Sequence, residues 1–245
     1  MNILCLWKGL NTDMKKKALL KDTLREIRKS FGRFFSIFAI VGIGVAFFAG
    51  VRDSVPVMKN TADTYFDDYN FMDLKIMSTI GMTKEDVSAI KAVDGVAGVY
   101  GSYSMDVLNT HNNQQRVYKL LSYPMHAKAS DKNYINQMRL IKGRLPQHED
   151  ECVIEYTNIK GTDSRIGETI SFTSGTDEKL SKSLKRTTYK IVGEVTMPYY
   201  LSYEKGSSSI GSGSIDNYAV IPDTNFKSSY FTEVYVTIDN AKKPK

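Results

Sequence analysis

The stretch FFSIFAIVGIGVAFFAGV, residues 34–51, decides the architecture of this chain. Its 18 residues carry no charge, and a helix of that length spans roughly 27 Å, close to the thickness of the hydrocarbon core of a bilayer. A core helix of a soluble protein seldom lacks polar residues on every side. We therefore interpret residues 34–51 as a transmembrane helix.

A cleaved signal peptide is the alternative for this segment, because Gly44 and Ala46 place small residues at the spacing of a cleavage site. Three features argue against it. The basic lead is long, the apolar run exceeds the usual signal-peptide length, and the large side chains of Phe47 and Phe48 follow the candidate cut.

The positive charge of the chain is concentrated before the apolar segment. The formal net charge is +6, and residues 14–33 account for all of it. A folded basic face for nucleic acid is therefore not expected. The twenty residues after the segment contain only Arg52 and Lys59 as cations, so the positive-inside rule predicts a cytoplasmic N-terminus, with residues 52–245 outside the cell membrane.

The basic lead also has helical periodicity. Its apolar residues are spaced as on one face of an interfacial helix, which is either a leaflet anchor and docking surface or the plain basic entrance to the span. The residues of this lead are Leu20, Leu24, Ile27 and Phe31 on the apolar face, with Arg25, Arg28 and Lys29 among the basic ones.

Within the span, Gly42, Ala46 and Gly50 recur every four residues. Small side chains on one face allow a second helix to approach closely, although glycine and alanine are common in membrane spans in any case.

From Phe71 onward the pattern predicts a mixed α+β domain. The order β-α-β-β is expected, with Thr83 as the cap of the helix and a turn at 111–113. The expected strands are 72–78, 96–107, 117–122, 152–155, 169–172, 189–195, 218–221 and 233–238. A subdomain boundary is expected near 123–137, a turn at 142–146, and a mobile surface loop at 206–216.

The residue types needed for catalysis or metal binding do not form recognisable motifs. Two cysteines and three histidines occur without ligand spacing, and the stretch GSSSIGSGS at 206–214 lacks the ending of a phosphate loop. The acidic run Glu149, Asp150 and Glu151 is interpreted as a solvated turn, and Tyr199, Tyr200 and Tyr203 as packing rather than a ligand surface. We expect neither an enzyme, a metal site nor a cofactor.

Several phrases resemble one known family. The lead LREIRKSFGRFF, the single span, the opening DLKIMSTIGMTKEDVSAIKAVDGVAGVYGSYS and the later IKGRLPQHEDECVIE are similar to the amino-terminal part of a bacterial ABC transporter permease of the FtsX/MacB type. The resemblance implies a MacB-like periplasmic core domain and a non-catalytic subunit. It also implies as partners a separate cytoplasmic ABC ATPase, further permease helices or a second permease copy, and membrane lipids.

One departure from that family is plain, because no further membrane span follows the outer domain up to Lys245. The chain is therefore expected to be an amino-terminal fragment. The rival hypothesis is a single-pass extracytoplasmic sensor or ligand-binding module, and a secreted domain is a third.

Overall fold

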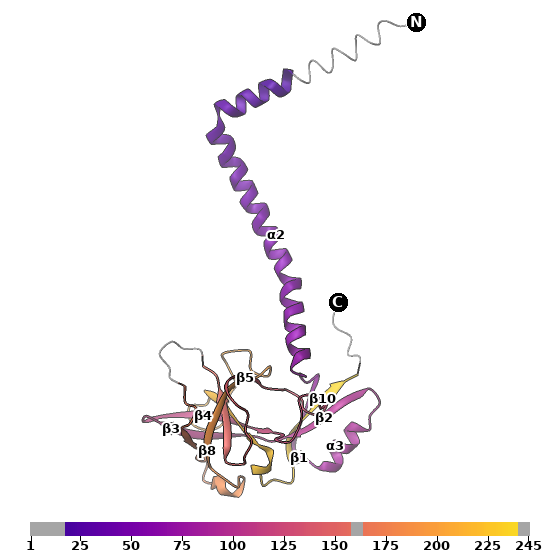
Figure 1. Ribbon diagram of the computed structural model, residues 1–245, viewed down its shortest axis with the longest axis vertical. Coiled ribbons are helices and arrows are strands. Elements are labelled where there is room, and N and C mark those ends of the chain that lie inside the picture. The colour runs from indigo at the N-terminus through magenta and orange to yellow at the C-terminus, as the bar shows by residue number, and fades with distance from the viewer. Residues whose placement is uncertain (1–17, 158–163, 240–245) are drawn as a thin grey trace. The chain divides into compact units, whose positions relative to one another are not determined.

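The structure is a computed structural model that describes residues 18–157 and 164–239. Its main elements are α2 (Phe31–Asp68), β1 (Leu74–Met82), α3 (Lys84–Lys91), β2 (Val96–Ser102), β3 (Ser104–His111), β4 (Gln114–Tyr123), β5 (Arg139–Gly143), β6 (Glu151–Glu155), β7 (Thr169–Ser171), β8 (Thr188–Thr196), β9 (Asn217–Pro222) and β10 (Phe231–Ile238). Figure 1 labels most of them. The fold is mixed α+β with one apolar helix near the N-terminus, as expected.

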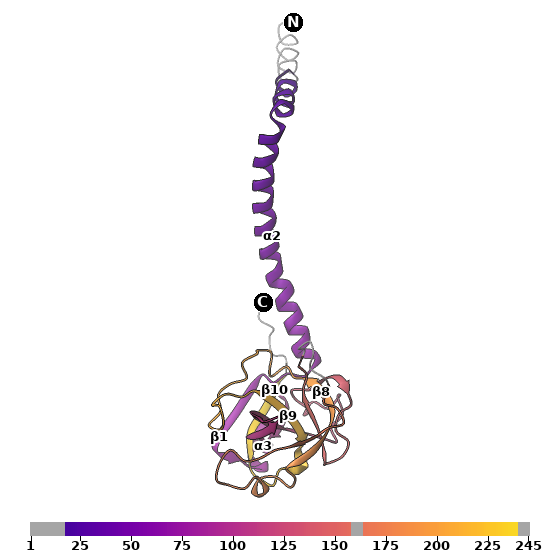
Figure 2. The same cartoon turned by 90° about the vertical axis from the view of Figure 1, so that its left-hand side faces the viewer.

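The predicted span lies inside a helix that is longer than the apolar run. Residues 18–29 are helical, and after Ser30 the helix α2 begins at Phe31 and continues to Asp68. Figure 2 shows α2 as one uninterrupted helix, although it contains Pro56. Within the described residues α2 alone is long and apolar enough to cross a membrane. The sequence did not predict that residues 52–68 continue the same helix.

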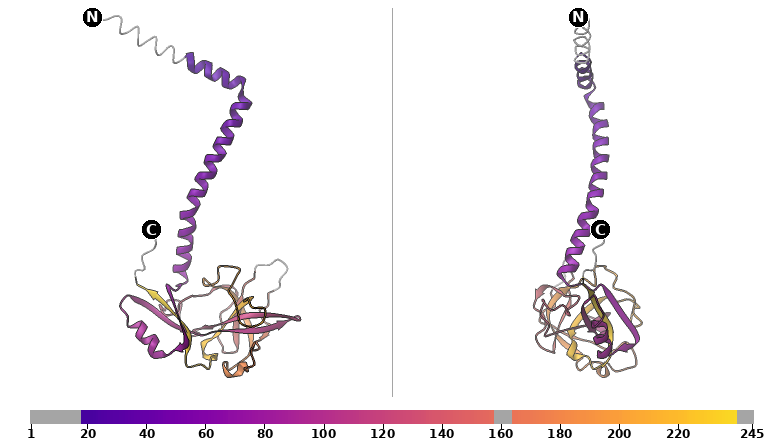
Figure 3. Two further views of the ribbon diagram at one scale, coloured as in Figure 1. Left: turned by 180° about the vertical axis from the view of Figure 1, so that it is seen from behind. Right: turned by 90° about the vertical axis from the view of Figure 1, so that its right-hand side faces the viewer.

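The remaining strands form two sheets. A three-stranded antiparallel sheet has the order β1-β10-β2, and a larger mixed sheet has the order β3-β4-β9-β6-β8-β5, with β7 paired to β8. We call them the small sheet and the large sheet. Helix α3 covers one face of the small sheet through Val87 and Ile90 (Figure 3). The structure has the order β1, α3, β2, β3, β4, which contains one strand more than the predicted β-α-β-β.

Local patterns predicted one helix cap and one turn correctly. Thr83 caps α3 and forms a full capping box with Asp86. Asn112 and Asn113 both have positive φ, at 50° and 60°, as the tight turn between β3 and β4 requires.

One strand prediction and one turn prediction were wrong. Residues 96–107 were expected as one strand, but the chain breaks at Tyr103, so that β2 joins the small sheet and β3 the large one. The expected turn at 142–146 begins inside β5, which pairs with β8 through a register shift near Lys142. Pairing partners far away in the sequence decide both features, and a local pattern does not contain them.

The glycine-rich stretch 206–216 packs more closely than a surface loop was expected to do. Ile210 is 7% exposed and Ile215 8% exposed. Ile210 packs with Leu108 and Val117, and a bridge joins Ser207 to Ser214. Although the stretch is rich in serine and glycine, its two isoleucines bury apolar surface and so hold it against the domain.

We predict that β10 holds the small sheet together. A chain shortened to end after residue 230 loses the strand that pairs with both β1 and β2. A fragment covering residues 62–239 should therefore unfold cooperatively on heating, whereas a fragment covering 62–230 should lose the small sheet. Circular dichroism melting and amide hydrogen exchange would measure this, and protected β1 amides in the shorter fragment would contradict it.

Candidate functional site at the end of the long helix

Helix α2 ends in a motif that fixes the direction of the following chain. Asn70 has a φ of 45°, Phe71 N donates to Phe66 O at 2.9 Å, and Asn70 N donates to Asp67 O at 3.1 Å. The rings of Phe66 and Phe71 stack with centroids 4.7 Å apart. These features make a Schellman cap, with asparagine at the left-handed position that glycine usually occupies.

The capped end of α2 is hydrogen-bonded to the segment that precedes β5. Asn70 Nδ2 donates to the carbonyls of Lys132 and Tyr134, at 3.1 and 2.9 Å. In return Asn136 N donates to Asn70 O at 2.9 Å, and Asn136 Oδ1 accepts from Met72 N at 3.1 Å. We call Asn70, Met72 and Asn136, with their hydrogen bonds, the joint.

The same helix end is also bonded to the small sheet. Asp73 N donates to Val236 O at 2.9 Å, and Asp73 Oδ2 accepts from Ile238 N at 2.8 Å. The first residue after the joint is therefore attached to the last residues of β10. A displacement of the helix end would act on both the small sheet and the segment leading into the large sheet.

An ion pair between half-buried Lys75 and buried Glu233 lies where the two sheets meet. Lys75 Nζ on β1 is 2.8 Å from Glu233 Oε1 on β10, and it donates to the Tyr199 hydroxyl at 2.6 Å. Tyr235 and Ser104 also donate to the Glu233 carboxylate, at 2.5 and 3.0 Å. Tyr199 follows β8 and Ser104 begins β3, so the network joins the small sheet to the large one.

Burial and pairing act against each other on these two charges. Burial alone would lower the pKa of Lys75, but hydrogen bonds to Glu233 and Tyr199 outweigh it, and the pKa of Lys75 is raised. Burial likewise opposes ionisation of Glu233, yet Lys75 and Tyr235 hold its pKa below the usual value. Both groups are charged at neutral pH.

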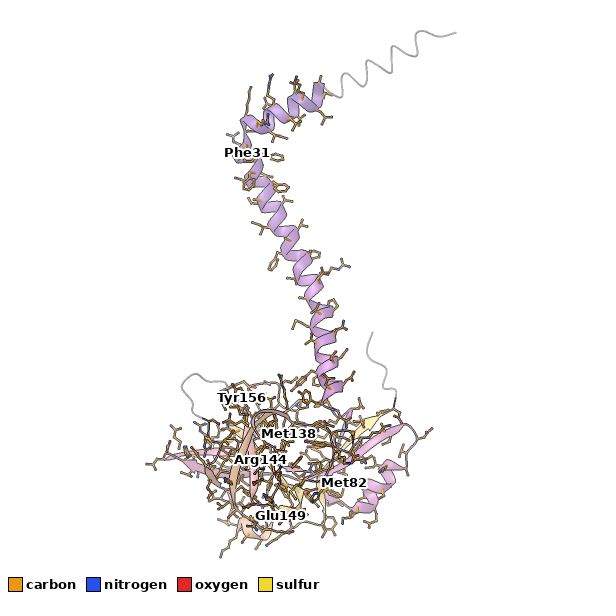
Figure 4. All side chains as sticks on the ribbon, in the orientation of Figure 1. Phe31, Met82, Met138, Arg144, Glu149 and Tyr156 are labelled. Atoms are coloured by element: carbon orange, nitrogen blue, oxygen red, sulfur yellow. The ribbon has the colours of Figure 1, made fainter. Side chains whose placement is uncertain are left out.

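The carboxylate of Glu151, which was expected to lie in solvent, is also buried. Glu151 is 5% exposed and accepts two hydrogen bonds from the Arg144 guanidinium, one of them at 2.7 Å. Gln147 N and His148 N donate to the same carboxylate at 2.8 and 3.2 Å. The prediction of a solvated acidic turn was therefore wrong for Glu151. Figure 4 labels Arg144 on the large-sheet side and Glu149 in the turn before β6.

The residues predicted from the sequence to bind the membrane or to pack against another helix lie outside the joint and outside the ion-pair network. Leu20 and Leu24 are exposed in the helical segment 18–29, with Arg25, Arg28 and Lys29, and Ile27 is half-buried. Phe31 opens α2, and Gly42, Ala46 and Gly50 are exposed along it. A side chain added at Gly42 or Gly50 would meet no described atom.

The three clustered tyrosines have different surroundings. Tyr199 joins the ion-pair network described above, and Tyr200 stacks on Tyr218 with centroids 4.9 Å apart. Tyr203 is 92% exposed. The interpretation as packing therefore holds for Tyr199 and Tyr200 and is wrong for Tyr203.

The described residues show no arrangement suited to metal or thiol chemistry. Across 18–157 and 164–239, no group of three or more histidine, cysteine or carboxylate side chains could hold a metal ion. Cys152 is fully buried, and burial raises the pKa of its thiol, which disfavours the reactive thiolate. Cys5 lies outside the described residues.

The joint was missed at the sequence level although one signal was present. Asparagine can replace glycine after the last helical residue, and in DDYNF an aromatic residue follows it directly, five positions after Phe66. This pattern could have located the end of α2 at Asn70. Nothing in the sequence indicates that Asn136 is its partner.

We predict a graded response at Asn70. Replacing Asn70 with glycine keeps the left-handed backbone but removes two side-chain hydrogen bonds, and should cost about 1–2 kcal/mol of unfolding free energy. Replacing it with alanine adds the penalty of positive φ, about 1 kcal/mol more. Urea unfolding would measure both. Equal stability of the two variants would contradict the left-handed cap.

We predict that removing one partner of the ion pair destabilises the protein more than removing both partners. Lys75→Met leaves Glu233 buried without its cation and should destabilise the protein by about 3 kcal/mol. The double variant Lys75→Met with Glu233→Leu should regain part of that loss, because neither charge is then buried alone. Urea unfolding of the single and double variants would measure the difference, and additive losses would contradict it.

We predict an acid-labile contribution from Glu151. The Arg144 guanidinium, with the Gln147 and His148 amides, holds the pKa of this buried carboxyl at about 2, below its usual value. A depressed carboxyl pKa stabilises the fold above pH of about 4.5, and this contribution is lost as the pH falls toward 2. Glu151→Gln should therefore lower the urea concentration at the midpoint of unfolding at pH 7. The same variant should change that midpoint much less near pH 2.

The chain matches no protein-family model and no curated protein sequence. It is similar to the solved extracellular domain of the noncanonic ABC-type transporter YknZ from Gram-positive bacteria, with 14% identity, a TM-score of 0.42, and coverage of 68% of this chain and 78% of that one. It is also similar to the periplasmic region of MacB from Actinobacillus actinomycetemcomitans, with 12% identity, a TM-score of 0.38, and coverage of 68% and 67%. Both solved structures are of regions outside the cytoplasm, one extracellular and one periplasmic.

Proposed function

We propose that this chain is the amino-terminal part of an ABC transporter permease subunit, in which α2 couples a separate cytoplasmic ATPase to the outer domain. One observation carries the proposal. The apolar run does not end in a loop but continues as helix to Asp68, where the joint attaches it to the sheets. A continuous helix can pass on a shift or rotation, whereas a flexible linker would absorb it.

In this proposal the chain belongs to the bacterial cell membrane and has three parts. Residues 1–33 are the cytoplasmic lead, residues 34–51 cross the bilayer, and residues 52–245 are extracytoplasmic, with a subdomain boundary near 123–137. The charge difference across the apolar run supports this orientation.

Labelling with a membrane-impermeant thiol reagent tests the orientation. Ser209 is exposed, so Ser209→Cys in intact spheroplasts should be labelled, whereas Cys5 should react only after the membrane is permeabilised. Cys152 is buried and gives little background. Labelling of Cys5 but not of position 209 in intact cells would reverse the topology.

We propose that the segment 18–29 binds to the inner leaflet of the membrane and to the ATPase. Leu20 and Leu24 face outward for burial in the leaflet, and Arg25, Arg28 and Lys29 attract anionic lipid, with about 1 kcal/mol for each cation near the surface. We further propose that Gly42, Ala46 and Gly50 contact the other permease helices or a second permease copy.

Charge reversal tests the role of this segment. Replacing Arg25, Arg28 and Lys29 by glutamate should reduce the amount of ATPase that co-purifies with the chain and leave the melting of the outer domain unchanged. Lys128, Lys179 and Lys185, exposed on the outer domain, form a matched control triple. If no ATPase co-purifies with the unaltered chain, the sensor or ligand-binding module is favoured instead.

A further inference from the structure

Five exposed cations gather on the outer domain where the chain enters β8. They are Lys179, Lys182, Lys185, Arg186 and Lys227, which we call the basic patch. Lys227 is distant from the others in the sequence, but its N donates to Ser183 O at 2.9 Å and its Nζ to Ser181 O at 2.7 Å. The fold therefore adds a fifth cation to the four that precede β8 in the sequence.

The basic patch is an ordered surface. Leu180 and Leu184, which lie between its lysines, are 7% and 0% exposed and belong to a core cluster of the large sheet. Leu184 N donates to Leu180 O, and Lys185 N donates to Asn225 O, both at 2.9 Å. Buried leucines and backbone hydrogen bonds thus hold the cations in place, so that they cannot move apart as they would on a free loop.

The charge of the basic patch exceeds that of its acidic neighbours. Asp177 and Glu178 precede it in the sequence, and Asn225 Nδ2 donates to the carbonyl of Glu149 on its other side. Lys182 Nζ lies 3.9 Å from Glu178, but both side chains are exposed, and such a pair contributes little. The chain outside the basic lead has no net charge, so the excess of cations here is local. A local excess of exposed cations attracts an anionic partner.

The side chains around these cations favour phosphate as the anion. Ser181 and Ser183 are exposed between the lysines, and lysine and serine side chains commonly contact phosphate oxygens. In the described stretch 177–190 the apolar side chains are buried, and Tyr189 is only 1% exposed. That stretch therefore offers no ring for stacking on a nucleic-acid base and no aromatic anchor for a protein interface. A partner held by charge and hydroxyl groups alone fits it best.

The basic patch and the end of α2 lie at opposite ends of β8. The last residue of β8, Thr196, pairs with Arg139 of β5. Two residues before Arg139, Gln137 N donates to Tyr69 O at 2.8 Å, and Tyr69 directly follows α2. The basic patch instead adjoins the first residue of β8, and a strand of nine residues is about 30 Å long. The lipid surface that α2 is proposed to cross is therefore not the favoured partner.

We propose that the basic patch binds an extended polymer that carries phosphate groups in series. Five cations on one surface match several phosphates of such a chain, whereas a single phosphate ion would contact only some of them. The inference concerns the outer domain, and it does not depend on the proposed coupling to an ATPase.

Lysine footprinting of the full chain, solubilised in non-ionic detergent, tests the proposal. Linear polyphosphate is the probe, and the acetylation of each lysine is measured by mass spectrometry with and without it. Lys179, Lys182 and Lys185 should be protected, and the protection should be lost as the salt concentration rises, because bound phosphates release counterions. Each lysine is read separately, so the lysines of the basic lead do not mask the result.

A triple variant of the basic patch gives the second measurement. Replacing Lys182, Lys185 and Arg186 by glutamine leaves Lys179 as the reporter. The polyphosphate concentration that half-protects Lys179 should rise by about tenfold or more, because fewer phosphates are neutralised.

The matched control replaces three lysines that are exposed elsewhere on the outer domain, Lys84, Lys91 and Lys128, by glutamine. This variant should leave the half-protecting concentration unchanged. Both triple variants should melt at the temperature of the unaltered chain, so that a loss of binding is not a loss of folding.

Three kinds of result would overturn the proposal. If the lysines of the basic patch are not protected, or are protected no better than those of the control set, the patch is an ordinary solvated surface. Equal protection by polyglutamate would show that phosphate is not the preferred anion. Protection by duplex DNA or by anionic lipid vesicles at a lower phosphate concentration would assign the patch to nucleic acid or to a membrane instead.

Discussion

The pairing of β10 with both β1 and β2 is the constraint on which the outer domain depends. A central strand hydrogen-bonds along both of its edges, and β10 follows its partners β1 and β2 by more than a hundred residues. The segment of the chain between β2 and β10 contains every strand of the large sheet. As a result, Glu233 is placed beside Lys75, and Ile238 is placed beside Asp73, five residues after the end of α2.

The two sheets have separate apolar cores, and hydrogen-bonded side chains lie between them together with ring contacts such as Tyr103 with Phe231 and Tyr199 with Tyr235. Met82, Val99, Val234 and Val236 form the core of the small sheet, whereas the large sheet has its own clusters. Between them lie the Lys75–Glu233 pair and the hydroxyl groups around Ser122. Apolar contact is tolerant of sliding, but paired charges and hydrogen bonds are satisfied in one geometry only. The polar contact therefore fixes how the sheets meet.

The joint combines these elements with the helix. The Schellman cap ends α2 in a defined direction, and the reciprocal bonds between Asn70 and Asn136 hold the next residues. Carbonyls just past the helix end need partners from elsewhere, and the segment before β5 supplies them, because Asn136 N donates to Asn70 O and Gln137 N donates to Tyr69 O. Strand β10 instead bonds to the amide and the carboxylate of Asp73. The mechanical role proposed for the chain requires this attachment.

Composition and periodicity by themselves determined the apolar helix, the basic lead, the capped helix α3 and most strands, because these depend on neighbours within a few residues. Only the tertiary structure decided the break at Tyr103, the burial of Glu151 and the partnership of Asn70 with Asn136. Each of these depends on a residue or strand that the fold, not the local sequence, brings into contact, so the candidate joint could not be assembled from the sequence alone.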